Sequence, residues 1–258
     1  MITIKSKREI ALMEEAGRLT AKTHEYIGEI IKVGMSTYEL DSLIEKFIRS
    51  HGGIPAEKGY PSGVRGVPDF PGSACISIND TVIHGVPSKD IIIQDGDIVS
   101  VDLVVEKNGY MGDACRTFMI GNVSPEARKL VEVTEAAFWE GIKYAKKGYR
   151  IGDISYAINE YVEKFGFSVV REFQGHGIGK EMHEDPGIPN YGKKGKGPRI
   201  EPGMTLAIEP MVIEKDPEIW ELDDGWTIVT ADGSLAAHYE NTILITENEP
   251  KVLTISKN

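Results

Sequence analysis

Apolar residues recur with a helical period over residues 7–32, which predicts an amphipathic helix. A second helical pattern begins at Ser36, where Ser36 and Glu39 form a capping box, and Gly52 is its expected stop. A stretch rich in glycine and proline, 52–72, has no periodic pattern and is predicted to be a loop. The first third of the chain is therefore expected to hold two helices and a long connection.

Short apolar runs typical of strands follow at 74–80, 91–94, 97–106 and 114–121. The last two runs flank the sequence Lys107-Asn108-Gly109, which predicts a β-hairpin. Helical patterns then return. Ser124 followed by Pro125 predicts the start of a helix that runs to about Lys147, and another helix is expected to begin near Asp153.

The order of these elements indicates an internal duplication. Shifting the sequence by 114 residues places Gly34 on Gly148 and keeps the apolar positions of both helix pairs in register. The predicted unit is helix-helix-sheet, with a boundary near residue 122. The whole chain, 1–258, is therefore expected to be one domain made of two related halves, about 1–122 and 123–258.

Lone carboxylates stand inside apolar strands in both halves. A shift of 107 residues places Asp102 on Glu209, and a buried carboxylate is costly unless something compensates it. Asp113 lies across the hairpin from Asp102. A loop at 107–108 would set the two directly opposite, whereas a turn at Asn108-Gly109 would make them diagonal neighbours. Both registers put them on one face of the sheet.

A fourth carboxylate, Glu240, precedes an apolar strand and corresponds to Asp113 under the duplication. Any one of these residues alone would more often be an edge residue or bonded to backbone. Four that converge favour two divalent ions sharing bridging carboxylates. Oxygen-rich ligands with one or two imidazoles suit Mn, Fe(II) or Co, with Zn as a further candidate.

Composition excludes several other classes. The net charge of −11 argues against a broad nucleic-acid surface, and no DNA partner is expected. No secretory signal and no run of apolar residues long enough to cross a membrane is visible. With only two cysteines, Cys75 and Cys115, a disulfide framework is not expected, and a reducing cytoplasm is the default location.

Five residues and their motifs resemble the metal ligands of the methionine aminopeptidases, and the resemblance covers essentially the whole chain. They are Asp102, Asp113 eleven residues later, His176 in GHGIG, Glu209 in IEP and Glu240 in YENT. Cys75 in ACISIND, the chain length and the short gap between His176 and Glu209 resemble the type I, bacterial form. The family implies the α+β pita-bread fold, in which two pseudo-symmetric halves surround a curved antiparallel sheet.

The resemblance also implies roles for these residues. Asp113 and Glu240 would bridge both ions, Asp102 would bind one ion, and His176 and Glu209 would bind the other. A water or hydroxide bridging the ions would attack the scissile carbonyl, and Glu209 would accept or shuttle its proton.

Two further histidines, His84 and His183, resemble the pair that contacts the substrate and stabilises the tetrahedral intermediate. His84 ends an apolar run, so it could instead be an ordinary core or turn histidine. The alignment of HGVP at 84–87 with HEDP at 183–186 favours the functional role. The remaining histidines, His24, His51 and His238, are expected to have structural roles.

The methionine pocket is also implied by the resemblance. Phe70, Cys75 and Trp226 match pocket positions, and Met182 takes a place often held by an aromatic residue. The loop at 53–73 is longer than expected, so Tyr60 could replace one wall of the pocket. For the four matched residues, ordinary core packing is an equal alternative.

The implied activity is removal of the N-terminal methionine from nascent polypeptides whose second residue is small, by a cytoplasmic monomer. The basic loop 193–199 is either a solvated surface loop or a site of transient ribosome contact. An X-Pro peptidase on the same scaffold is the second interpretation, although its relatives usually carry a separate domain before the first helix. A non-catalytic binding module is the third, and the intact ligand set argues against it.

Overall fold

The computed structural model describes residues 1–256. Helix α1 (Lys7–Ile30) starts at Ser6 with a reciprocal capping box, and α2 (Thr37–Ser50) starts at Ser36, whose hydroxyl accepts the N–H of Glu39 at 3.1 Å. Both helices begin where hydroxyl residues can satisfy free amides, and α2 is the helix predicted from Ser36.

The second helix pair is α3 (Pro125–Ile142) and α4 (Ile151–Glu163). Ser124 caps α3 as predicted, because its hydroxyl accepts the N–H of Ala127 at 3.0 Å. The predicted end near Lys147 is wrong. After Ile142 the amides of Tyr144 and Ala145 bond to carbonyls three residues back, which tightens the chain into turns.

The first half-sheet holds β1 (Ile54–Pro55), β2 (Cys75–Ile78), β4 (Ile98–Lys107) and β5 (Tyr110–Met119). β1 and β2 share one edge of β4, and β5 pairs along the other edge. The β4–β5 hairpin turns at Asn108 and Gly109, both with positive φ, as a two-residue hairpin loop requires.

The strand predicted at 91–94 is wrong. Only an isolated bridge between Ile92 and Ser36 forms there, and Ile91 and Ile92 are exposed. The reason is local. The N–H of Gln94 bonds to the Asp97 carboxylate at 2.7 Å, so this amide does not pair with a neighbouring strand.

Residues 1–256 also form three further sheets, in the orders β13-β10-β6, β11-β12-β3 and β15-β14-β9-β7-β8. Their strands are β3 (Thr81–Ile83), β6 (Ser168–Val169), β7 (Gln174–Gly177), β8 (Glu184–Pro189), β9 (Thr205–Ile208), β10 (Met211–Ile213), β11 (Ile219–Glu221), β12 (Ile228–Thr230), β13 (Ala236–His238), β14 (Asn241–Leu244) and β15 (Lys251–Val252).

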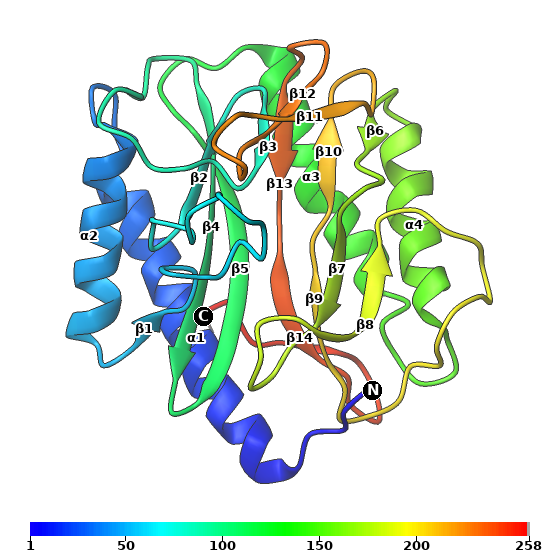
Figure 1. Ribbon diagram of the computed structural model, residues 1–258. Helices are drawn as coiled ribbons and strands as arrows, with labels where there is room; N and C mark the ends of the chain where they lie inside the picture. Colours follow the sequence, from blue (N-terminus) through cyan, green and yellow to red (C-terminus); the bar gives the residue numbers. More distant parts are fainter. Residues whose placement is uncertain (257–258) are drawn as a thin grey trace.

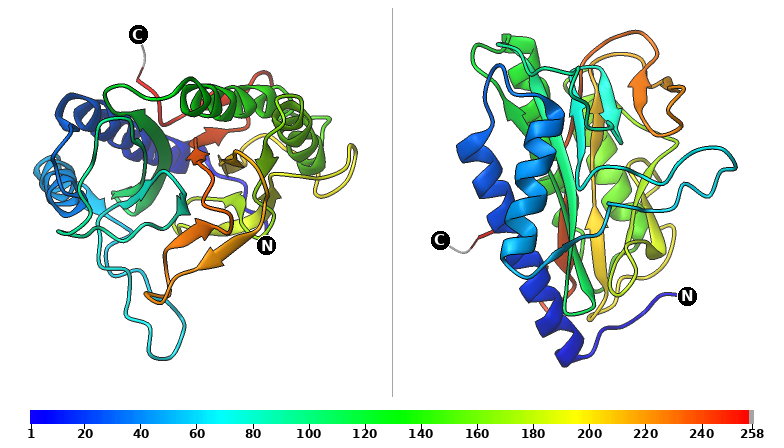
Figure 2. Two further views of the ribbon diagram at one scale, coloured as in Figure 1. Left: turned by 90° about the horizontal axis from the view of Figure 1, so that it is seen from above. Right: turned by 60° about the vertical axis from the view of Figure 1, so that its left-hand side comes forward.

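The helix pairs lie against the same side of the curved arrangement of strands (Figures 1 and 2). One buried core joins α1 and α2 to β2 and β4, and another joins α3 and α4 to β9, β10 and β14. The strands are therefore covered by helices on one side, which leaves the other side for a site. Within residues 1–256, no helix is long and apolar enough to cross a membrane.

A short seam joins the two halves. Cys115 and Glu240 exchange backbone hydrogen bonds, of 3.1 and 3.4 Å, and the Thr242 hydroxyl bonds to both backbone groups of Asp113. We propose that the halves are a duplicated unit. The matched glycines Gly34 and Gly148 support this, because both adopt positive φ after the first helix of their half.

Candidate metal centre and adjoining pocket

The hairpin register decides how the first two carboxylates meet. Asp102 pairs with Cys115, and Asp113 pairs with Val104, so Asp102 and Asp113 are diagonal neighbours. This is the alternative that the Asn108-Gly109 turn predicted. Both carboxylates project from the same face of β4 and β5.

The seam adds Glu240 to this pair. Because its backbone bonds to Cys115 of β5, Glu240 lies beside the hairpin that carries Asp102 and Asp113. It immediately precedes β14, as predicted, and it is 2% exposed. Asp113 is 4% exposed, so two carboxylates lie in a nearly dry environment.

His176 and Glu209 come from neighbouring strands of the second half. His176 pairs with Ala207 of β9, and Glu209 follows directly after β9. The prediction had placed Glu209 inside a strand, but Pro210 lacks an N–H for the ladder, and β10 resumes only at Met211. His176 Nε2 lies 3.6 Å from Glu209 Oε1 and 3.7 Å from Asp113 Oδ2.

The imidazole of His176 is also oriented. Its Nδ1 donates to the carbonyl of Gly177 at 2.8 Å, which leaves Nε2 as the nitrogen facing the carboxylates. A backbone partner on the second ring nitrogen is the usual support for a metal-binding histidine.

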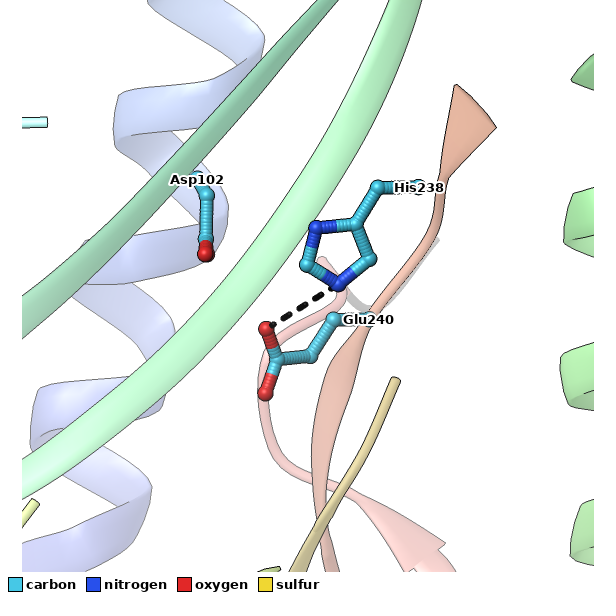
Figure 3. Close-up of side chains that lie close together, drawn as sticks. All are labelled: Asp102, His238 and Glu240. Carbon is cyan, nitrogen blue, oxygen red and sulfur yellow. Dashed lines mark ion pairs between the residues drawn. The ribbon is translucent and has the colours of Figure 1, made fainter. Parts of the chain in front are cut away.

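His238, for which only a structural role was expected, also belongs to this cluster (Figure 3). Its Nε2 lies 3.8 Å from Glu240 Oε2 and 3.9 Å from Glu209 Oε2. Burial lowers the pKa of His238 to about 3, so its imidazole is neutral. The only sign of this role in the sequence is that His238 lies two residues before Glu240.

Two groups of side chains could each hold an ion: Asp102 with His238 and Glu240, and Asp113 with His176 and Glu240. Glu240 is common to both, as expected of a bridging carboxylate. The distances of 3.7 Å from His176 Nε2 to Asp113 Oδ2 and 3.8 Å from His238 Nε2 to Glu240 Oε2 exceed hydrogen-bonding range, which leaves space between these side chains.

Several polar atoms of the cluster have no partner. They are Asp102 Oδ1, Asp113 Oδ1, Glu240 Oε1 and His238 Nε2. Burial raises the pKa of Asp102 to about 7, and burial followed by neighbouring carboxylates raises those of Asp113 and Glu240 well above their usual range. Unpaired oxygens and unfavourable charge fit a cation, which would satisfy both.

A cavity of about 180 Å³ adjoins this cluster. All six residues predicted to contact substrate line it: Phe70, Cys75, His84, Met182, His183 and Trp226. The ring of Phe70 meets that of Trp226 edge-on at 5.2 Å, so these two form an aromatic wall. The volume is small for a ligand pocket and suits a single side chain.

The two predicted substrate-contacting histidines both border the cavity. Burial lowers the pKa of His183, and burial followed by the charge of His183 lowers that of His84 to about 4. The Tyr60 hydroxyl lies 2.8 Å from His183 Nδ1, so donation by Tyr60 keeps the His183 proton on Nε2. Tyr60 is therefore both a wall of the cavity and a partner of His183.

The other two histidines have the structural roles that were expected. His24 is buried in α1, with Nε2 2.8 Å from the carbonyl of Ala114, and His51 lies at the end of α2, with Nδ1 2.8 Å from the carbonyl of Phe47. Sequence reasoning missed Glu57, a buried residue that lines the cavity. Its surroundings in the sequence, PAEKGYP, give no sign of this position.

Comparison with known proteins agrees with this geometry. The sequence pattern of metallopeptidase family M24 matches residues 11–247. The chain belongs to this family. It is 50% identical over 255 residues to a methionine aminopeptidase of Clostridium acetobutylicum, and 99% of each chain is covered. It is 48% identical over 254 residues to methionine aminopeptidase 1 of Bacillus subtilis, covering 98% of this chain and 99% of that one.

A solved methionine aminopeptidase of Thermotoga maritima superposes with a TM-score of 0.95 at 42% identity, covering 99% of this chain and 100% of that one. The predicted family and its pita-bread fold are therefore confirmed. These relatives are metalloexopeptidases, which agrees with a carboxylate and histidine cluster able to hold a metal ion.

Proposed function

We propose that this chain removes the N-terminal methionine from nascent polypeptides whose second residue is small. The observation that carries the proposal is the position of the cluster: unpaired buried carboxylates lie at the wall of a cavity whose volume fits one side chain. The full-length similarity to methionine aminopeptidases supplies the substrate.

Two divalent ions are proposed for the cluster. Asp113 and Glu240 would contact both ions, Asp102 would hold one with His238 nearby, and His176 and Glu209 would hold the other. The ions, Co, Mn, Fe(II) or Zn, supply Lewis acidity and water that ionises near neutral pH. The buried oxygens of Asp102, Asp113 and Glu240 that have no hydrogen-bond partner support this proposal, because metal ions would satisfy them.

The remaining steps belong to protein side chains. Glu209 is proposed to accept a proton, because its carboxylate lies in the cluster, with Oε1 3.6 Å from His176 Nε2 and Oε2 3.9 Å from His238 Nε2. His84 and His183 are neutral near pH 7 and each can donate one N–H, so they are proposed to bind the carbonyl and amide of the scissile bond. Phe70, Cys75, Met182 and Trp226 would enclose the methionine side chain.

The test is release of free methionine from Met-Ala-Ser after metal-free protein is supplied with Mn, Fe(II) or Co. Turnover of this peptide, with no cleavage of Gly-Pro or Lys-Pro dipeptides, is the expected result. The matched control is a chain in which two ligands are changed, Asp102→Asn with Glu240→Gln. Absence of turnover with every ion would refute the proposal, and cleavage of the X-Pro dipeptides would favour the prolidase-like alternative.

A transient ribosome contact is proposed for the basic loop 193–199. The loop is exposed, and it is held by the N–H of Gly152, which bonds to the carbonyl of Lys196 at 3.0 Å. The lysine side chains are thus presented on an anchored turn. Replacing Lys193, Lys194 and Lys196 by alanine should reduce co-sedimentation with ribosomes, and unchanged co-sedimentation would remove this proposal. We also propose that the chain acts as a monomer in the cytoplasm.

A further inference from the structure

His84 has a backbone conformation that residues other than glycine seldom adopt. Its φ is 56°, in the left-handed region. Asn79 and Asn108 share this region, but asparagine tolerates it and both lie in turns of the chain. His84 instead follows directly after β3, where an extended residue would continue the strand. The left-handed conformation costs energy, so it persists only where the surrounding structure holds it.

The strand before His84 fixes one end of this residue. Ile83 pairs with Ile228 of β12, and both side chains are buried. The pairing fixes the peptide group that enters His84, and this group is planar and does not rotate internally. The histidine backbone is therefore anchored on its amino side.

Two hydrogen bonds to β2 anchor the other side. The N–H of Gly85 donates to the hydroxyl of Ser77 at 3.1 Å, and the carbonyl of Gly85 accepts the N–H of Ile76 at 2.9 Å. Because the N–H of Gly85 lies in the peptide group that leaves His84, its bond to Ser77 sets the rotation ψ of His84 directly. Gly85 allows this close approach, since a Cβ there would lie 2.2 Å from the carbonyl oxygen of Ile76.

The anchored backbone determines where the imidazole of His84 lies. Val82 and Ile83, the two residues before it, belong to a buried apolar core. His84 lines the cavity instead, and its ring meets those of Phe173 and Trp226 edge-on, with centroids 5.6 and 6.5 Å away. The left-handed residue at the end of β3 thus turns the chain so that a side chain with a hydrogen-bond donor faces the cavity.

We propose that Ser77 is a positioning residue, which holds His84 in its left-handed conformation and so directs the imidazole toward the scissile bond. Ser77 is 3% exposed, and within residues 1–256 it is not among the side chains that line the cavity, so its effect passes through His84. Without the hydroxyl, the N–H of Gly85 loses its acceptor, and His84 can relax toward an extended conformation that moves the imidazole. This inference rests on the proposed aminopeptidase function.

The first experiment is a double-mutant cycle on the hydrolysis of Met-Ala-Ser, with the wild type, Ser77→Ala, His84→Ala and the double variant. Ser77→Ala should lower kcat/KM roughly 2- to 10-fold, the effect of one neutral hydrogen bond. The loss should fall on kcat, because a group that stabilises the reacting carbonyl acts on the transition state. In the His84→Ala chain, the same serine change should have no further effect.

Ser155→Ala is the matched control for the loss of a buried serine hydroxyl. Ser155 is also buried, but its hydroxyl bonds to the carbonyl of Ile151 within α4, and its replacement should leave kcat unchanged. Poorer folding or metal loading caused by Ser77→Ala would lower activity equally with and without His84. Equal losses in the two backgrounds therefore overturn the inference. An unchanged kcat/KM in Ser77→Ala, or a change confined to KM, overturns it as well.

Thermal unfolding tests the anchored backbone without the use of activity. His84→Gly and His84→Ala both lack the imidazole, but glycine adopts a φ of 56° without strain. His84→Gly should therefore have the higher Tm of the two, although glycine ordinarily lowers Tm relative to alanine. An equal or lower Tm for His84→Gly would show that the backbone is not held in the left-handed region and would overturn the inference.

The two experiments separate this inference from the proposed function. If the wild type releases no methionine with any ion, the aminopeptidase function fails and the positioning role of Ser77 fails with it, while the order of the two Tm values still decides whether His84 is anchored. If the wild type releases methionine and Ser77→Ala acts equally in both backgrounds, the function stands and the Ser77 inference alone fails.

Discussion

Replacing Asp102 by asparagine should stabilise the metal-free protein and reduce the further stabilisation that metal ions give. Burial raises the pKa of Asp102 from 3.8 to about 7, so the folded metal-free chain keeps a proton that the unfolded chain loses above pH 3.8. Its stability therefore falls as pH rises from 3.8 to 7, and the full penalty is present above pH 7. Asparagine removes this penalty because it has no proton to lose.

The size of the effect follows from the pKa difference. About 3 pKa units at 1.36 kcal/mol each give a gain of up to about 4 kcal/mol at pH 7.5, and about 2 kcal/mol at pH 5.5. For a chain of this size, 4 kcal/mol corresponds to a rise in Tm of roughly 8–16 °C. Metal ions narrow this difference, because the ion that Asp102 would hold adds about 2.7 kcal/mol at one hundred times its Kd only to the chain with intact ligands.

The assay is thermal unfolding followed by circular dichroism, at pH 5.5 and 7.5, after removal of metal by a chelator and again with Mn added. Asp90→Asn is the matched control, since Asp90 is an exposed aspartate away from the cluster. Either of two results would contradict this prediction: a metal-free Asp102→Asn protein that melts no higher than the wild type at either pH, or a Mn-induced shift in Tm as large as that of the wild type.

Three further changes separate the roles of the remaining residues. His183→Ala should lower kcat/KM about 100-fold and leave the Mn-induced shift in Tm unchanged, and a reduced shift would instead make His183 a ligand. Tyr60→Phe should lower kcat on Met-Ala-Ser about tenfold in steady-state kinetics, because the His183 tautomer is then no longer fixed by the Tyr60 hydroxyl. An unaffected kcat would show that the 2.8 Å contact does not orient His183. Burial lowers the pKa of His24 to about 3. Between pH 6.5 and 3 the unfolded chain therefore takes up a proton at His24 that the folded chain does not. The free energy of unfolding falls as the pH is lowered through this range. His24→Gln keeps a donor for the carbonyl of Ala114. Urea denaturation should show that the free energy of unfolding falls between pH 7.5 and 5 by about 2 kcal/mol less in this variant than in the wild type. Equal decreases in the two proteins would contradict the lowered pKa of His24.

Features that depend on neighbouring residues could be predicted from the sequence alone. Ser124 and Pro125 fix the start of α3 through capping, and Asn108-Gly109 closes the β4–β5 hairpin because both positions need positive φ. Lone carboxylates such as Asp102 in an apolar strand stood out because a carboxylate among apolar residues is costly unless something compensates it.

Which side chains share the site depends on how distant strands pair in the folded chain. The bonds between Cys115 and Glu240 join strands 125 positions apart in the chain, and this pairing places Glu240 between the two groups of possible ligands. His238 enters the cluster for the same reason, although its sequence position suggested an ordinary role. Glu57 reaches the pocket because β1 pairs with β4 and delivers the following turn to the cavity wall. Capping and turn preferences act over a few residues, whereas proximity across the seam depends on long-range strand pairing, which no local pattern encodes.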